Sequence, residues 1–427
     1  MSNEITTAEA KAVLEEAAPK QRFIGIDIVK ILAAFLVVGI HFFLYSGFYN
    51  EPIDESGEMV PIFFRWLCYN CVPMFMIVSG YLMKNKTISK KYYLGLIKII
   101  AIYLIMSVIC AVFDHEHYGK EFTPWTFVRG LFMFSNAPYS WYVEYHICIL
   151  LLAPFINLAF NGLKNKKHQL TLVVTVLALT AFARSFFVGL ERDTQIQVFP
   201  DYFSASFGIA YYLAGAYIRQ NPPKRTALNK LLYLMGLLLV LGWNTVTTYY
   251  HSTLNADYNY IFTSWHYNDY GTWPVFLASL FIFLLLFDIS SKNRVVIKIF
   301  QFISEATLGC YLISYVFDNS NYAEFVGTYP EMADRLTHAP LIVGKNFLAS
   351  MGVALVVHHL YNLCDWAVRK IYRSRKDKKA AMAEIESMTA DDVEVMAEAA
   401  EEVVEINNAC EETAAEPVMV SSAEKTE

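Results

Sequence analysis

Charged side chains are scarce in this chain of 427 residues. Only 17% of its residues are charged, whereas 56% are hydrophobic and the mean hydropathy is +0.34. Soluble domains have about 25% charged residues. The composition therefore excludes an ordinary soluble enzyme and indicates a polytopic membrane protein.

A disulfide framework, an internal repeat and a cleavable signal peptide are also missing. The seven cysteines are an odd number, and most of them lie in apolar runs, so no disulfide framework is predicted. Cys68 and Cys71 have the spacing of a redox or metal motif, but in a membrane helix we expect them to pack as small hydrophobic side chains. No repeat supports an inverted-repeat transporter. Residues 1–21 are polar and mixed in charge, and the apolar segment after them is long enough to span a membrane rather than be cleaved off.

The sequence does contain a series of long apolar segments. A helix needs about 20 residues to cross the hydrocarbon of a bilayer. We therefore predict an all-α membrane protein with about ten transmembrane helices. The predicted spans are residues 24–46, 61–83, 93–113, 140–160, 168–189, 203–219, 229–249, 272–289, 296–317 and 341–364.

The loops between these segments alternate in charge. One set is rich in lysine and arginine, and the other set is acidic or aromatic. The basic set comprises residues 84–91, 164–167, 224–230, 292–298 and 369–379. Because basic loops stay in the cytoplasm, both termini are predicted to be cytoplasmic, which places His41 toward the outer face.

The C-terminal end of the chain differs in charge from the rest. Residues 384–427 contain fourteen acidic residues and one lysine, a balance of −13, whereas the whole chain has a net charge of −6. We predict a cytoplasmic N-terminal segment over residues 1–21, a membrane domain over residues 22–367 and a cytoplasmic tail over residues 368–427. The tail is basic and then acidic, which is typical of a disordered or partly helical segment and not of a catalytic domain.

The first apolar segment contains three ionisable residues, Asp27, Lys30 and His41. Lys30 and His41 are eleven residues apart, about 20° from three full turns of a helix, so their side chains share one face. Asp27 lies one turn before Lys30 on that face. A charge in the bilayer costs at least a few kcal/mol unless it faces a partner or water, so we expect this face to line a cavity. The alternative is an Asp27–Lys30 pair at the inner interface, with His41 at the outer one.

His41 is the strongest candidate for catalysis. A histidine with a near-neutral pKa can take a proton from a hydroxyl group or carry an acyl group transiently. Further polar residues complete a path between the two faces: Lys98 in the inner half, and Arg65, Glu144 and His146 in the outer half. Such a path suits the transfer of a group across the bilayer, and it also suits a transporter.

Two outer loops carry weaker signals. Residues 114–117 (Asp-His-Glu-His) resemble a metal cluster, but no third set of ligands accompanies them, so no metal is predicted. The aromatic loop 249–271 is suited to stacking on sugar rings, and it is equally typical of a membrane interface.

Four motifs together resemble acyltransferase family three, a family of integral-membrane enzymes that O-acylate polysaccharides and other envelope molecules. They are Lys30 with His41, Pro73-x-Phe75-x-x-Ser79-Gly80-Tyr81, the pair Trp141-Tyr142, and Tyr311-Leu312-Ile313. The resemblance covers about residues 20–365. The chain departs from the family pattern in the third span, where Gly95 replaces the first residue of the basic pair and leaves Lys98, and at Ser314, where the family often has histidine.

The resemblance implies a membrane O-acetyltransferase of the bacterial cytoplasmic membrane. Acetyl-CoA would approach from the cytoplasm, and the hydroxyl group of an envelope glycan or another acceptor would approach from outside. His41 would act as general base or acyl carrier, and Lys30 would orient the donor. The other implied residues are Lys98, Asp27 and Ser79 on the donor side, and Trp141, Tyr142, Glu144, His146 and Arg65 on the acceptor side. The lipid bilayer is a further implied partner. The resemblance implies no metal and no nucleic acid, and the oligomeric state stays open.

Two other classes of function remain open at this point. One is a transporter or flippase for a small polar or lipid-linked substrate, which would show vectorial uptake without acyl-CoA. The other is a membrane sensor that binds a cell-wall ligand and recruits a partner through the acidic tail.

Overall fold

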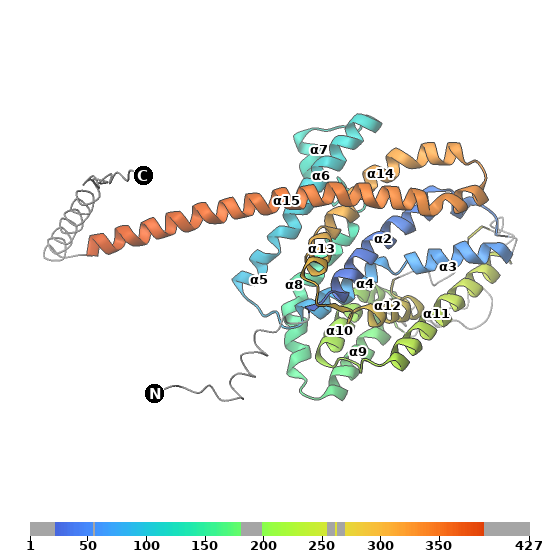
Figure 1. Cartoon of the computed structure of the whole chain (residues 1–427), viewed down its shortest axis with the longest axis horizontal. Helices are drawn as coiled ribbons and strands as arrows, with labels where there is room; N and C mark the ends of the chain where they lie inside the picture. The colour runs from blue at the N-terminus through green and yellow to red at the C-terminus, as the bar shows by residue number, and fades with distance from the viewer. Residues whose placement is uncertain (1–21, 54–55, 181–198, 254–260, 263–269, 388–427) are drawn as a thin grey trace, which may run out of the picture. The chain divides into compact units, whose positions relative to one another are not determined.

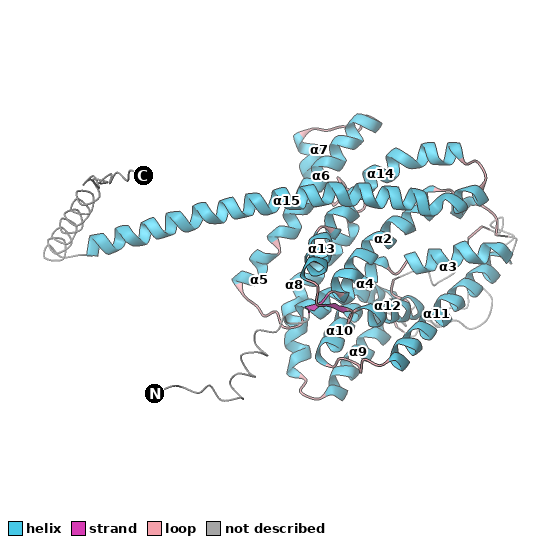
Figure 2. Ribbon diagram, viewed as in Figure 1, coloured by secondary structure: helices cyan, strands magenta, loops and turns pink. Residues whose placement is uncertain are grey.

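The computed structural model describes residues 22–53, 56–180, 199–253, 261–262 and 270–387. Over these residues the chain is almost entirely helical, which confirms the predicted all-α class (Figure 2). The only paired strands among them are β1 (Arg22–Phe23) and β2 (Ser290–Ser291), which run antiparallel. The chain forms two compact units, Met1–Leu360 and Tyr361–Glu427.

Figure 1 shows the helices of the described residues in chain order. The α-helices are α2 (Gly25–Tyr45), α3 (Met59–Cys68), α4 (Cys71–Met83), α5 (Lys90–Gly95), α6 (Ile97–Tyr118), α7 (Pro124–Phe132), α8 (Trp141–Gly162), α9 (Lys166–Thr180), α10 (Phe207–Gln220), α11 (Ala227–Thr253), α12 (Trp273–Leu286), α13 (Arg294–Glu305), α14 (Thr307–Thr328) and α15 (Met332–Ser387). Short 3₁₀ turns are η1 (Phe48–Asn50), η2 (Ser56–Glu58) and η3 (Asp201–Ser206).

Within the described residues, six helical segments are long and apolar enough to cross a membrane. They are Gly25–Tyr45, Met59–Met83, Lys90–Tyr118, Trp141–Gly162, Ala227–Thr253 and Met332–Arg375. Each of them overlaps a predicted span, and the predicted span 296–317 falls on α13 and α14, a pair bent by 56°. The other three predicted spans fall on the shorter helices α9, α10 and α12, and residues 181–189 lie outside the described residues. The count of ten spans and the cytoplasmic termini stay predictions.

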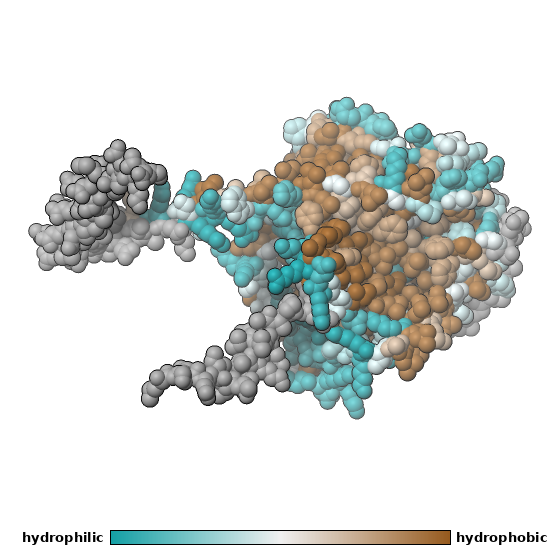
Figure 3. Space-filling model, in the orientation of Figure 1, coloured by the Kyte–Doolittle hydropathy of each residue, from teal (hydrophilic) through white to brown (hydrophobic). Residues whose placement is uncertain are grey.

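The surface carries the apolar side chains that a lipid environment requires. On α11, Leu231, Leu238 and Leu239 are each more than half exposed, and α8 exposes Phe155 and Leu158 in the same way. Figure 3 shows such apolar residues in brown over a broad area, bordered by polar residues in teal. An exposed apolar area of this extent is typical of a surface that faces the hydrocarbon of a membrane.

The first turn of α2 is fixed in place by the end of α12. The backbone N–H groups of Ile24 and Gly25 both donate to the carbonyl oxygen of Ile289 at 2.9 Å. A Cβ atom on Gly25 would lie 2.0 Å from the carbonyl oxygen of Leu286, so only glycine allows this approach. The position of Asp27, two residues further along, is set by this contact.

Two glycines bring α4 and α10 into backbone contact. A Cβ atom on Gly80 would lie 1.8 Å from the carbonyl oxygen of Tyr212, and one on Gly215 would lie 2.0 Å from the carbonyl oxygen of Ile77. Small residues permit such close packing in membrane proteins. Within the Ser-Gly-Tyr motif, Gly80 therefore serves the packing of α4 on α10. Its neighbour Ser79 lines a cavity.

Candidate active site

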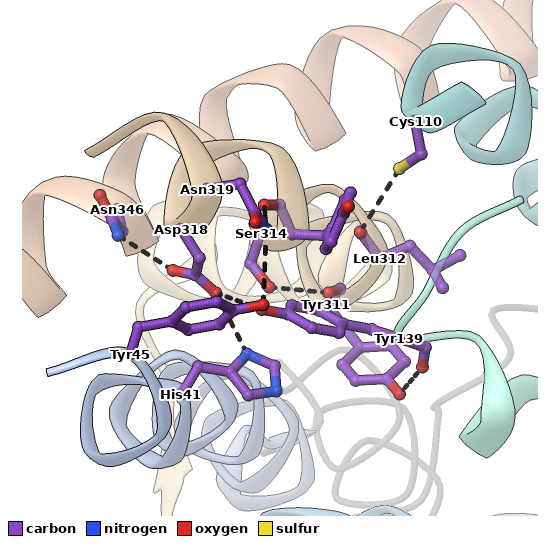
Figure 4. A network of polar contacts seen from close by, with 11 residues as sticks. His41, Tyr45, Cys110, Tyr139, Tyr311, Leu312, Ser314, Asp318, Asn319 and Asn346 are labelled. Carbon is purple, nitrogen blue, oxygen red and sulfur yellow. Dashed lines mark hydrogen bonds and ion pairs between the residues drawn. The ribbon is translucent and has the colours of Figure 1, made fainter. Parts of the chain in front are cut away.

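His41 faces a carboxylate on a helix that is distant in the sequence. It lies near the end of α2, and its Nδ1 is 3.2 Å from Oδ2 of Asp318 on α14 (Figure 4). The Asp318 side chain is fully buried, whereas 14% of the His41 side chain is exposed. The two groups are at ion-pair distance, although the contact does not have hydrogen-bond geometry. A buried carboxylate beside an imidazole stabilises the positive charge that the ring acquires when it takes up a proton.

Hydrogen bonds hold both oxygens of Asp318. The Tyr139 hydroxyl donates to Oδ2 at 3.0 Å, and Nδ2 of Asn346 donates to Oδ1 at 2.9 Å. The Tyr139 hydroxyl also lies 3.1 Å from that of Tyr45 (Figure 4). The Tyr139 ring covers the imidazole of His41, with 3.9 Å between the ring centroids. The carboxylate and the Tyr139 ring thus confine His41 from two sides.

At the other end of α2, Asp27 and Lys30 share one hydroxyl group. Ser304 on α13 donates its Oγ–H to Oδ1 of Asp27 at 2.6 Å and accepts a hydrogen bond from Nζ of Lys30 at 3.4 Å. Lys30 and His41 therefore both face the bent pair α13–α14, as their shared helix face predicts. The eleven residues between them correspond to a rise of about 16 Å.

A cavity of about 310 Å³ lies beside Lys30. Two polar pairs line it: Oγ of Ser79 is 2.9 Å from Nε2 of His146, and Oε2 of Glu305 is 3.1 Å from Nε2 of His358. The lining residues are Lys30, Phe75, Val78, Ser79, Leu82, Met83, Gly95, Lys98, Ile99, Ile102, Tyr142, His146, Ser304, Glu305, Ala306, Thr307, Leu308, Gly309, Tyr311, Ala354 and His358. Most of the wall is apolar, with polar groups at a few places, as is usual for ligand pockets.

The charged side chains of the cavity suit an anionic ligand. Lys30 and Lys98 contribute two ammonium groups, and Glu305 contributes one carboxylate, which already faces His358. Lysine binds phosphate groups as a point charge. The cavity thus combines two ammonium groups and one carboxylate with an apolar wall.

A layer of tyrosines separates this cavity from His41. Tyr142 and Tyr311 line the cavity and meet edge to face, with ring centroids 5.6 Å apart. The hydroxyl of Tyr311 donates to the backbone carbonyl of Tyr139, whose ring lies on His41. His41 is not one of the described residues that line the cavity. These tyrosines connect the lining of the cavity to the residues around His41.

An aromatic stack contains two more of the predicted residues. Trp141 lies on Tyr270 with 5.7 Å between ring centroids, and Tyr270 lies on Tyr69 at 4.5 Å. The guanidinium of Arg65 follows, 4.5 Å from the centroid of the Tyr69 ring, and its Nε donates to the Tyr49 hydroxyl at 3.0 Å. Trp141 is 42% exposed, so the open end of the stack lies at the surface.

The structure thus divides the predicted site residues into groups. The cavity contains Lys30, Lys98, Ser79, Tyr142 and His146, with Asp27 behind Ser304. His41 lies in the network around Asp318, Trp141 and Arg65 lie in the aromatic stack, and Glu144 is exposed on α8. Tyr142 and His146 share the cavity with Lys30 and Lys98, although they are predicted on the acceptor side. The donor and acceptor roles of all these residues stay predictions.

Asp318 is the residue that sequence reasoning missed. The ninth predicted span ends at residue 317, which leaves residues 318–340 to an outer loop, but α14 continues to Thr328. Asp318 lies on this helix seven residues after Tyr311, two turns along the same face. A carboxylate in phase with the tyrosine of the Tyr-Leu-Ile motif is the signal that could have found it.

The segment 114–117 is part of a hydrogen-bonded pair of helices. Oδ2 of Asp114 is 2.5 Å from Nζ of Lys120, and its Oδ1 accepts a hydrogen bond from the Tyr315 hydroxyl at 2.8 Å. In the part of the chain that the structure describes, no three histidine, cysteine or acidic side chains gather as a metal ion would require.

Comparison with known proteins supports one identification. The model of the acyltransferase family 3 domain matches residues 23–333. No curated protein and no solved structure shows significant similarity to the chain. The matched range includes His41, Asp318 and the start of the cavity at Lys30, whereas Asn346 and His358 lie beyond it.

Proposed function

This chain belongs to acyltransferase family 3, and from that premise we propose that it moves an acetyl group from cytoplasmic acetyl-CoA to a hydroxyl group of an extracytoplasmic envelope glycan. Acyltransferase activity follows from the family, and the apolar helices make the protein a multi-pass membrane protein. The acetyl donor, the glycan acceptor and a bacterial cytoplasmic membrane are our proposal.

The observation that carries this proposal is the contact between His41 and Asp318. Because Nδ1 of His41 faces the buried carboxylate, Nε2 is the nitrogen that remains to accept a proton. We assign His41 the role of general base. It removes the proton of the acceptor hydroxyl while the oxygen attacks the acetyl carbonyl carbon. The bond between that carbon and the sulfur of CoA breaks, and the proton held by His41 passes to the thiolate, which leaves as CoA.

The cavity beside Lys30 is the proposed place of the donor. Its volume of about 310 Å³ accommodates the pantetheine arm but not the whole of acetyl-CoA, so the nucleotide would lie outside. Lys30 and Lys98 would meet phosphate groups at the cytoplasmic end. The thioester would then lie under the tyrosine layer, on the side of the cavity nearest to His41.

Transfer of labelled acetyl groups tests this function. Membrane vesicles that contain the protein and envelope glycan are given acetyl-CoA with a labelled acetyl group, and ester-linked label on the glycan is measured by mass spectrometry. His41→Ala should reduce transfer at least 100-fold, since a general base contributes about 10²–10⁴ in rate. The exposed His168 provides a matched control, and His168→Ala should keep full activity.

Two results would contradict the proposal. Equal transfer by His41→Ala and the unsubstituted chain would remove His41 from the chemistry. Uptake of a small polar or lipid-linked substrate into vesicles without acyl-CoA, and without ester formation, would favour a transporter instead.

A further inference from the structure

A separate charged surface lies on the last helix, within the second unit. Residues 369–379 contain seven lysine or arginine residues and one aspartate. They belong to α15, which continues as a helix to Ser387. Arg369, Lys370 and Arg373 are exposed, and at 100° per residue they lie within about 100° of one another on the helix surface.

A tryptophan completes this surface. Trp366 points to the same side by the same helix geometry, and its side chain is 62% exposed. Nζ of Lys370 lies 5.1 Å from the centroid of the Trp366 ring. Tryptophan beside lysine or arginine is typical of the level at which a membrane helix passes through the lipid headgroups. We call Trp366, Arg369, Lys370 and Arg373 the cationic face.

The distance from the apolar part of the helix places the cationic face at the depth of phosphate groups. Leu363 and Val368, which are 48% and 65% exposed, precede Arg369 by six residues and by one residue, rises of about 9 and 1.5 Å along α15. The headgroup region on one side of a bilayer is about 5–8 Å thick. The long side chains of arginine and lysine cover the remaining difference because they can bend back toward the phosphates.

The nearby acidic residues leave the charge of this face largely uncompensated. Asp365 accepts a hydrogen bond from Nε of Arg369 at 2.7 Å, which leaves the terminal nitrogens of that guanidinium for a ligand. Asp377 follows Arg373 by four residues, about one turn of the helix, so residues 365–379 contain seven lysine or arginine residues against two aspartates. Glu384 is the first acidic residue after Asp377. It follows Arg373 by eleven residues on the same helix, a rise of about 16 Å. Charges in water are screened within about 8 Å at physiological ionic strength.

We propose that the cationic face binds the phosphate groups of anionic phospholipids in the leaflet where α15 leaves the membrane. Each lysine or arginine at an anionic lipid surface favours association about fivefold, and the three cations here act on one small area. The binding would enrich anionic lipid around the end of the last span. It is independent of the acyl transfer proposed above.

A fluorophore on Cys364 can report this enrichment, because Cys364 is an exposed free thiol two residues before Trp366. Cys148, the other exposed thiol among the described residues, is replaced by serine, and so is Cys410. The full chain is reconstituted in phosphatidylcholine vesicles that contain equal amounts of either brominated phosphatidylglycerol or brominated phosphatidylcholine. We expect brominated phosphatidylglycerol to quench at least threefold more strongly at low salt, and the ratio to approach one in 0.5 M salt.

Substitutions then locate the effect. Arg369→Gln, Lys370→Gln and Arg373→Gln together should bring the quenching ratio close to one, and the protein should keep its elution volume in size-exclusion chromatography. Lys164→Gln, Lys166→Gln and Lys167→Gln remove three cations from another loop and should leave the ratio unchanged. Equal quenching by the two lipids in the unsubstituted chain would overturn the proposal. A lipid preference that appears only in a chain ending at Lys379 would also overturn it, and would assign the face to the acidic tail.

Discussion

Replacing Asp318 with asparagine removes the charge beside His41 and keeps nearly the same shape. Asn346 can still donate to the side-chain oxygen, and the Tyr139 hydroxyl can accept a hydrogen bond from the new amide nitrogen. The buried site therefore keeps its hydrogen bonds, and we expect the substituted protein to fold. What it loses is the negative charge that lies 3.2 Å from Nδ1 of His41.

The size of the effect follows from that distance. Two unit charges 3.2 Å apart interact by about 5 kcal/mol at an effective dielectric constant of 20, which is an upper bound. Interactions of hydrogen-bonding groups with a charged partner are worth about 1.5–3 kcal/mol in proteins. Because the imidazole of His41 becomes positive only as it takes the proton, this stabilisation belongs to the transition state. Asp318→Asn should therefore lower kcat by about 10- to 200-fold and change KM for the acyl donor little.

The assay is the rate of labelled acetyl transfer in vesicles, normalised to the amount of monodisperse protein. Glu324→Gln is the matched control, since Glu324 is an exposed carboxylate on the same helix, and it should keep full activity. If Asp318→Asn retains more than a third of kcat while His41→Ala is inactive, the carboxylate does not assist His41, and its hydrogen bonds serve the packing of α14 alone.

Two further substitutions test the packing of α4 and the donor cavity. Gly80→Ala places a methyl group 1.8 Å from the carbonyl oxygen of Tyr212 and should destabilise the protein by about 1–3 kcal/mol or more, measured as a lower Tm in detergent. The control Gly242→Ala meets no atom within 4 Å and should leave Tm unchanged. Equal Tm values for the two substituted proteins would contradict the close α4–α10 contact. Lys98→Gln should raise KM for acetyl-CoA about tenfold with little change in kcat, because it removes one proposed partner of the phosphate groups. The control Lys91→Gln, outside the cavity, should change neither KM nor kcat. An unchanged KM in Lys98→Gln would exclude Lys98 from the donor site.

The parts of the fold with strong hydropathy are predictable from the sequence. α2 and α8 are found within a few residues of their predicted ends, because a continuous apolar run leaves few alternatives to a helix in lipid. The common face of Lys30 and His41 is also predictable, since it depends only on the period of a straight helix. These inferences need no knowledge of which helices are neighbours.

The extent of α14 was not predictable in this way. After residue 317 the sequence reads Asp-Asn-Ser-Asn, which has the polarity of a loop. Tertiary hydrogen bonds keep these residues helical: Asp318 accepts from Asn346, and Asn321 donates to the Asn346 side chain at 2.8 Å. The hydrogen bonds that stabilise this part of α14 come from Asn346 on α15, and a hydropathy profile of the local sequence does not include them.

The pairs that define the cavity are likewise a property of the folded chain. Ser79 and His146 are separated by 67 residues, and Asp27 and Ser304 by 277. Each residue could be selected from its own segment as a polar group in an apolar run. The prediction for His146 rests on its depth along α8, and depth alone does not show which residues the side chain meets; its acceptor-side role stays a prediction. The structure directs it into the wall that also contains Ser79.

The tyrosine layer links the cavity beside Lys30 to the network around His41 and Asp318. Tyr139 accepts the hydrogen bond of Tyr311 through its backbone carbonyl, places its ring on His41 and binds Asp318 through its hydroxyl. Tyr142, three residues later, lines the cavity. Any movement of this segment that opens a passage from the cavity to His41 therefore also shifts the ring and the hydroxyl group that position the imidazole and the carboxylate. Because Tyr139 contacts both the cavity wall and His41, a displacement of this segment would change the surroundings of both together.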